Sequence, residues 1–207
     1  MSAPGLRSLH DQELLDLVDD ITAEFAGPLD GAITAMITQL LVLWNSSVGD
    51  NGPTAAQLSS IQTTITALLD DLPLGLDVDQ LLGRLQEAVD LGVTQAAAES
   101  GLRPAKAGLT DEITESVRGL PTRMLAALVG ARKLLKAKDI NSLADVLAVV
   151  GVAKQGLNTL NSTISSETSK ATAHGAGAVA ERSGYPRLWV PERDACLECQ
   201  RYAGLLA

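Results

Sequence analysis

The sequence predicts an all-α protein: a largely elongated bundle of several helices, with one long helix rich in small residues and a short extended tail at the C-terminus. Of the 207 residues, 46% are hydrophobic but only 2% are aromatic. A core built from Leu, Val, Ile and Ala favours helices over a β-sandwich or barrel. Apolar residues also recur at helical spacing, between Gly and Pro breaks that divide the chain into separate helices.

Two helices are expected before residue 48. The first covers 10–25, and Gly27 and Pro28 end it. The second, 29–48, is apolar on all sides, so we expect it to be the more buried of the two. The expected apolar face of the first helix consists of Leu14, Leu15, Val18, Ile21 and Phe25.

The loop at 48–53 is the clearest break in the chain, because it combines Gly, Asp-Asn-Gly and Pro. Pro53 sits at the start of a third helix, which runs to Asp71. A fourth helix carries an apolar stripe from Leu81 to Val93.

The next helix has a recognisable beginning at Thr110, the expected N-cap, with Asp111 and Glu112 in its first turn. Leu120 and Pro121 should kink or restart it. Its later apolar positions are Leu125, Leu128, Leu134 and Leu135.

The last helix is the longest, from an N-cap at Asn141 or Ser142 to about Arg182. Its second part is rich in Ser, Thr, Ala and Gly, which permit close helix–helix approach without driving isolated helix formation. We therefore expect it to need partners, and neighbouring subunits are one possibility. Its apolar positions are Leu143, Val146, Leu147 and Val150, followed by Leu157, Leu160 and Ile164.

The net charge of −9 is unevenly distributed. Residues 1–100 have a balance of −13, and residues 101–207 have a balance of +4. The sign changes at the Gly- and Pro-containing segment 99–109, so we predict a domain boundary there. The predicted domains are an acidic helical domain, 1–100, and a helical domain with the basic run and the long helix, 101–183.

Six basic residues of the second half form a run between Ser116 and Lys138 that no acidic residue interrupts. It could contact a polyanion such as DNA or an acidic protein surface, or it could simply be a solvated helix face. Its members are Arg118, Arg123, Arg132, Lys133, Lys136 and Lys138.

The two cysteines, Cys196 and Cys199, are three positions apart near the C-terminus. They supply half of a tetrahedral zinc site, and His174 could be a third ligand. A redox pair would be expected beside a βαβ sheet, a context that is absent, and the alternative is two small buried thiols that close a turn. With two histidines in the chain and no G-x-S-x-G motif, we expect a protein that is not an enzyme and needs no cofactor, zinc being the one candidate.

The location of the protein is predicted from what the chain lacks. The N-terminus has no apolar signal region, and no window approaches the roughly 20 apolar residues that a membrane span requires. Two closely spaced cysteines do not form a disulfide framework. We expect a reducing cytoplasm and no membrane contact.

The C-terminal tail, SGYPRLWVPERDACLECQRYAG, resembles the signature of the phage Mu F-like minor head, or head morphogenesis, family, in the form found in phages of actinobacteria. The resemblance covers only about residues 170–204, and the domain that carries the motif would be incomplete, because family members continue past Gly204. The matching positions are Trp189, Asp194, Cys196, Cys199, Tyr202 and Gly204.

This resemblance implies a structural role. Such proteins are minor components of the capsid interior and associate with the portal during head assembly. It implies the portal and capsid proteins as partners, several copies around the portal, possible contact with packaged DNA, and a location in the virion after assembly in the host cytoplasm. In this interpretation 184–207 is a docking segment in which Trp189 and Val190 anchor against the helices, since an aromatic ring buries a large area.

Two other functions stay open. A small thiol- or zinc-dependent enzyme would use Cys196 and Cys199, although the scarcity of histidine argues against it. A helical export-type interaction protein would show a Trp-x-Gly turn between two helices, and Trp44 has no Gly two residues later.

Overall fold

The structure, a computed structural model, describes residues 6–47, 53–137 and 140–183, and all regular secondary structure in these segments is helical. The prediction of an all-α, multi-helix protein is therefore confirmed. The seven described helices, in chain order, are α1 (Leu6–Phe25), α2 (Gly27–Ser47), α3 (Ala55–Asp70), α4 (Val78–Ser100), α5 (Asp111–Arg118), α6 (Leu120–Ala137) and α7 (Leu143–Ser183).

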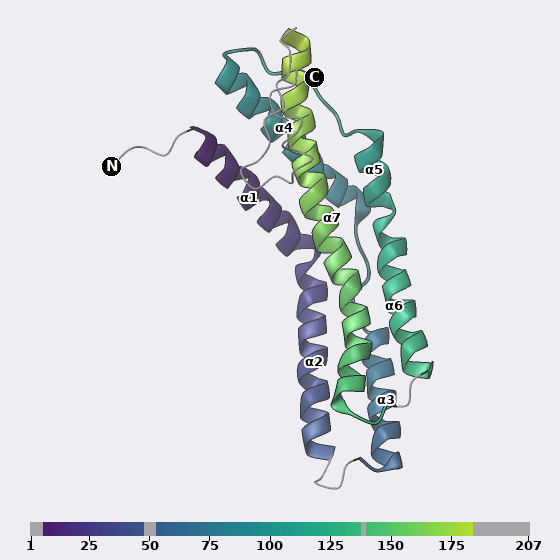
Figure 1. Cartoon of the computed structure of the whole chain (residues 1–207). Coiled ribbons are helices and arrows are strands. Elements are labelled where there is room, and N and C mark those ends of the chain that lie inside the picture. The colour runs from purple at the N-terminus through teal and green to yellow at the C-terminus, as the bar shows by residue number, and fades with distance from the viewer. Residues whose placement is uncertain (1–5, 48–52, 138–139, 184–207) are drawn as a thin grey trace, which may run out of the picture.

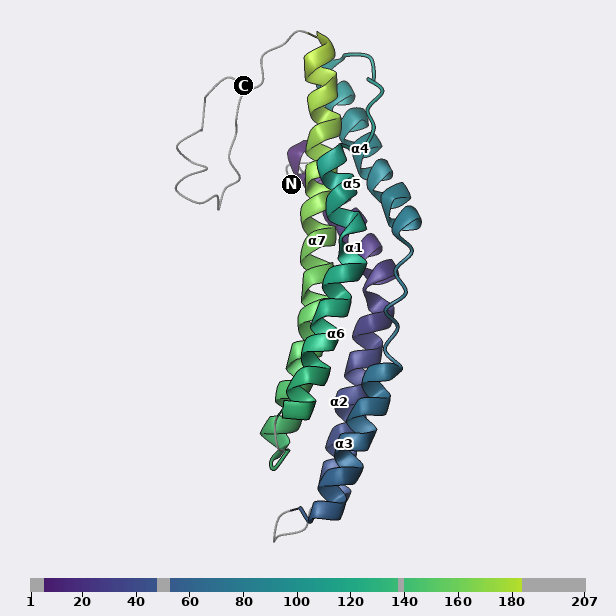
Figure 2. The same cartoon turned by 90° about the vertical axis from the view of Figure 1, so that its right-hand side faces the viewer.

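The bundle is elongated and is organised around α7 (Figure 1). This helix has 41 residues and therefore spans about 60 Å. It packs against α1, α2, α4, α5 and α6. The pair α2 and α3 lies beside one half of α7, α1 and α4 lie towards the other half, and α5 and α6 follow one another along its side (Figure 2). The predicted long helix is thus the element that connects the rest of the bundle.

The helix beginnings are encoded by short polar residues. Thr110 is the N-cap of α5, as predicted, and its hydroxyl oxygen accepts from the backbone N–H of Ile113 at 3.3 Å. Ser142, one of the two predicted residues, caps α7 and accepts from the N–H of Asp145 at 3.2 Å. At α3 the N-cap is Thr54, so Pro53 precedes the helix instead of forming its first turn. Threonine caps the helix because its hydroxyl oxygen can accept from a free backbone N–H, which a proline side chain cannot do.

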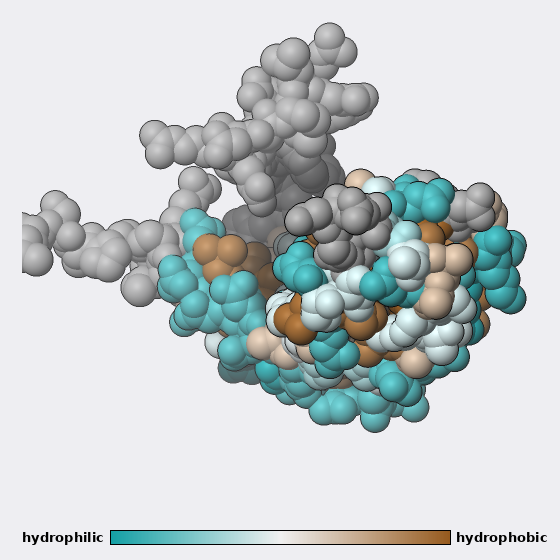
Figure 3. Space-filling view, turned by 90° about the horizontal axis from the view of Figure 1, so that it is seen from below, coloured by the Kyte–Doolittle hydropathy of each residue, from teal (hydrophilic) through white to brown (hydrophobic). Residues whose placement is uncertain are grey.

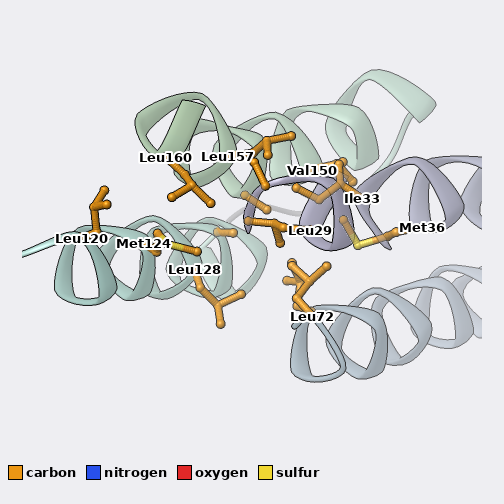
Figure 4. Packing of buried hydrophobic residues seen from close by; sticks show 14 of the residues in the cluster. Leu29, Ile33, Met36, Leu72, Leu120, Met124, Leu128, Val150, Leu157 and Leu160 are labelled. Carbon is orange, nitrogen blue, oxygen red and sulfur yellow. The ribbon is translucent and has the colours of Figure 1, made fainter. Parts of the chain in front are cut away.

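One hydrophobic core runs through the bundle and includes residues of all seven described helices. Figure 4 shows part of it, where Leu29 and Ile33 of α2, Met124 of α6 and Leu157 of α7 converge. The core continues past the predicted boundary at 99–109, because α4 packs extensively against α7. Residues from both sides of 99–109 thus belong to this core.

α4 and α7 approach each other closely at two glycines. A Cβ atom at Gly92 would lie 1.9 Å from the carbonyl oxygen of Thr172, and one at Gly175 would lie 2.0 Å from the carbonyl oxygen of Val89. At these points the backbones of the two helices are in contact, with no room for a side chain. The small residues of α7, predicted to permit close approach, do so here within one chain.

α2 buries one stripe of its surface, at Leu29, Ile33, Met36 and Leu40. It is more buried than α1, as expected. Its apolar residues are not buried on every side, however, since Val42 is 63% exposed. By length and composition α2 is the one described helix that could cross a membrane, a property that core helices of soluble proteins share.

Three apolar residues expected in the core are instead exposed. Leu15 of α1 is 57% exposed, Leu125 of α6 is 51% exposed and Leu147 of α7 is 40% exposed. Helical spacing predicted their faces only approximately, because the edge of a buried stripe depends on where the neighbouring helices end. In the end-on view of Figure 3, apolar surface lies in separate patches among hydrophilic side chains.

Candidate functional site

The basic run lies on α5 and α6, and the structure does not gather it into one patch. Arg118 ends α5, whereas Arg132, Lys133 and Lys136 lie in the last turns of α6. Arg123 is nine residues before Arg132, a separation of about 14 Å along the helix. Lys138 lies outside the described residues.

Two of the five described basic residues are engaged within the protein. The guanidinium of Arg123 donates to the carbonyl oxygen of Ser116 at 2.7 Å, so this side chain closes the end of α5. Arg132 forms an ion pair with Asp70 of α3. These contacts join neighbouring elements and leave each cation less available to a polyanion.

The other three cations, Arg118, Lys133 and Lys136, are exposed and form no ion pair within the segments that the structure describes. Lys136 also lines a groove of about 450 Å³ between α3 and α6. The groove contains the Asp70–Arg132 pair, and the carboxylate lowers its attraction for phosphate groups. The free positive charge is therefore concentrated on the outer face of α6, at Lys133 and Lys136.

A polar cluster that the sequence reasoning missed joins α5 to α7. Glu167 of α7 is only 4% exposed, and its Oε1 atom accepts from the hydroxyl of Ser116 at 2.9 Å and from the ammonium of Lys170 at 3.2 Å. Lys170 also donates to Glu112 at 3.2 Å. The sequence contains an indication that Glu167 is buried. It follows Ile164 by three residues and so falls on the buried stripe of α7.

These contacts raise the pKa of Lys170 above its ordinary value of 10.5, first through the hydrogen bond to Glu112 and then through Glu167. A raised pKa means that folding favours the protonated amine. The resulting stabilisation is complete below pH 10.5 and is lost as the pH rises through the raised pKa. The buried carboxylate of Glu167 then faces a neutral amine in place of a cation.

We expect Lys170→Met to lower the Tm at neutral pH, because it leaves a buried carboxylate without its cation. The difference in Tm between the two proteins should shrink as the pH is raised beyond 10.5. Circular dichroism melts across this range test it, with Lys154→Met as the control, since Lys154 is exposed on the same helix and unpaired in the described structure. A Tm difference that stays constant with pH would contradict the assigned role.

The residues of the C-terminal motif lie outside the described residues, which end at Ser183. This applies to Trp189, Asp194, Cys196, Cys199, Tyr202 and Gly204. The half-site for zinc at the two cysteines therefore stays a prediction. Within the described segments, no group of three or more His, Cys, Asp or Glu side chains is arranged to hold a metal ion.

The described residues define a class by their architecture: an elongated all-helical bundle around one long helix. Comparison with known protein families finds no match to the chain, and comparisons with curated proteins and with solved structures find none either.

Proposed function

We propose that the protein is a minor capsid protein of a tailed phage, which binds at the portal on the capsid interior during head assembly and DNA packaging. The observation that carries the proposal is the ordered motif from Trp189 to Gly204, which follows directly after a long helix rich in small residues. In this proposal the protein acts by binding, and the helical bundle is an assembly module that presents the motif.

The distribution of charge supports this proposal. Arg118, Lys133 and Lys136 are free to meet packaged DNA or an acidic surface of the portal. The outward carboxylates of α1 would repel DNA and so would face away from it. One elongated molecule could therefore lie between the packaged DNA and the protein wall of the capsid.

Quantitative mass spectrometry of purified particles tests the proposal. We expect a copy number that matches the portal ring, and we expect the protein to stay with the portal after the DNA is released. A soluble phage enzyme would be the control, because its amount in the particles shows how much protein is trapped non-specifically. Absence from particles would overturn the proposal, and bound zinc with measurable turnover would then favour the thiol- or zinc-dependent enzyme.

Trp189→Ala provides a second test, because the proposal assigns this ring the role of an anchor. We expect the variant to be incorporated into particles in smaller amounts, while its circular dichroism spectrum still shows the helical content of the wild type. Lys154→Ala, a change of an exposed residue on α7, is the matched control. Normal incorporation of Trp189→Ala would argue against a docking role for the motif.

A further inference from the structure

The outward face of α6 carries a stripe of four residues that we call the α6 stripe: Leu125, Val129, Lys133 and Lys136. Leu125 is 51% exposed and Val129, one turn later, is 38% exposed. The two lysines continue the same side of the helix at spacings of four and three residues. Two exposed aliphatic side chains one turn apart, followed by two cations without partners, differ from a uniformly solvated helix face.

The outward face of α1 carries negative charge, opposite to that of the α6 stripe, on both sides of an exposed leucine. Leu15 is 57% exposed, and Asp11 and Asp19 lie one turn before and one turn after it. We call these three residues the α1 stripe. Neither aspartate forms an ion pair in the described part of the chain.

Other acidic residues of α1 are committed within the molecule. Glu24 pairs with Arg84 of α4 at 3.0 Å, and Glu13 accepts a hydrogen bond from Gln95 of α4 at 2.8 Å. These contacts fix one side of α1 against α4. The α1 stripe is therefore presented to solvent on a helix that is held in place.

We propose that the α6 stripe of one copy of this protein docks on the α1 stripe of a second copy. Aliphatic side chains would meet at the centre, and lysines would lie beside aspartates at the rim. Two α6 stripes would place lysine against lysine, and two α1 stripes would place aspartate against aspartate. Charge complementarity thus selects the unlike pairing over either symmetric dimer.

The position of the two stripes determines the form of the assembly. α1 and α6 lie on opposite sides of α7 in the view of Figure 1. One molecule cannot pair its own stripes, so each copy binds one neighbour through α6 and another through α1. Such a head-to-tail contact builds a closed ring or an open filament. Because the apolar area at each contact is small and the charges are exposed, association depends on protein concentration and weakens with salt.

Sedimentation velocity of the purified full chain tests this inference. We expect the mean mass to rise with concentration and to fall on addition of salt. Reversing the α6 stripe with Lys133→Glu and Lys136→Glu should weaken association by about tenfold or more, and so should Asp11→Lys with Asp19→Lys in the α1 stripe. A chain with all four changes restores opposite charges and should associate again, which separates a lost contact from a damaged fold.

Lys154→Glu, which reverses a charge on α7, is the matched control and should associate like the wild type. Three results would overturn the inference: a wild-type protein that stays monomeric, unchanged association after reversal of the α1 stripe, or no recovery in the four-site variant. The measurement uses no portal or capsid component. Its failure would leave the proposed capsid function standing, and its success would not establish that function.

Discussion

Gly92→Ala and Gly175→Ala should each destabilise the protein by about 2 kcal/mol or more. In each case the new Cβ would lie within 2.0 Å of a backbone carbonyl oxygen on the facing helix, which no rotation of a side chain can relieve. α4 and α7 would have to move apart, and overpacking in a tight interface typically costs about 1–3 kcal/mol and sometimes more. Alanine's better helix propensity offsets about 1 kcal/mol of this cost.

Two other glycines on the same helices provide matched controls for urea unfolding. Gly83 in α4 and Gly151 in α7 have open space where a Cβ would lie. Gly83→Ala and Gly151→Ala should therefore stabilise the protein by about 0.5–1 kcal/mol, through helix propensity alone. Equal free energies of unfolding for Gly151→Ala and Gly175→Ala would show that α4 and α7 do not approach as described.

Leu160→Ala should lower the free energy of unfolding by about 3 kcal/mol. Leu160 has no exposed surface and points from α7 into the core near Leu120 and Met124 of α6 (Figure 4). Removing a buried leucine side chain costs the lost transfer free energy and leaves a cavity, together about 2–5 kcal/mol. The effect should reach the whole bundle, because α7 packs against helices from both halves of the chain.

Leu147→Ala, on the same helix, is the control for Leu160→Ala. Because Leu147 is 40% exposed, its truncation should cost less than about 1 kcal/mol. Urea unfolding followed by circular dichroism should show one transition that Leu160→Ala moves as a unit. A variant in which only part of the helical signal is lost early would show that the halves of the core unfold independently.

Local chemistry explains why the helices could be predicted so closely. Thr110, and Ser142 as one of two alternatives with Asn141, are predicted as caps because a short polar side chain satisfies a free N–H at the first turn, whatever the rest of the protein does. Leu120 and Pro121 likewise marked the restart that separates α5 from α6. Caps and prolines of this kind act on residues only three or four positions away, so their effect can be predicted from the sequence.

The candidate surface was predicted only in part. The sequence identified the basic residues, but not that Arg132 pairs with Asp70, 62 positions earlier in the chain, or that Arg123 closes the end of α5. Nor did it place Leu125 on the surface beside free lysines. Ion pairs between distant segments depend on which helices become neighbours, and helical spacing does not contain that information.

The sequence by itself determined the helical class, several of the helix starts and the division of charge along the chain, because composition, capping and spacing act locally. The tertiary structure decided which helices meet. It brought the backbones of α4 and α7 into contact, at Gly92 against Thr172 and at Gly175 against Val89, and it left Leu15 and Leu125 outside the core. The physical reason is that close packing of α4, α6 and α7 depends on the complementary shapes of whole helix faces, which residues far apart in the chain create together.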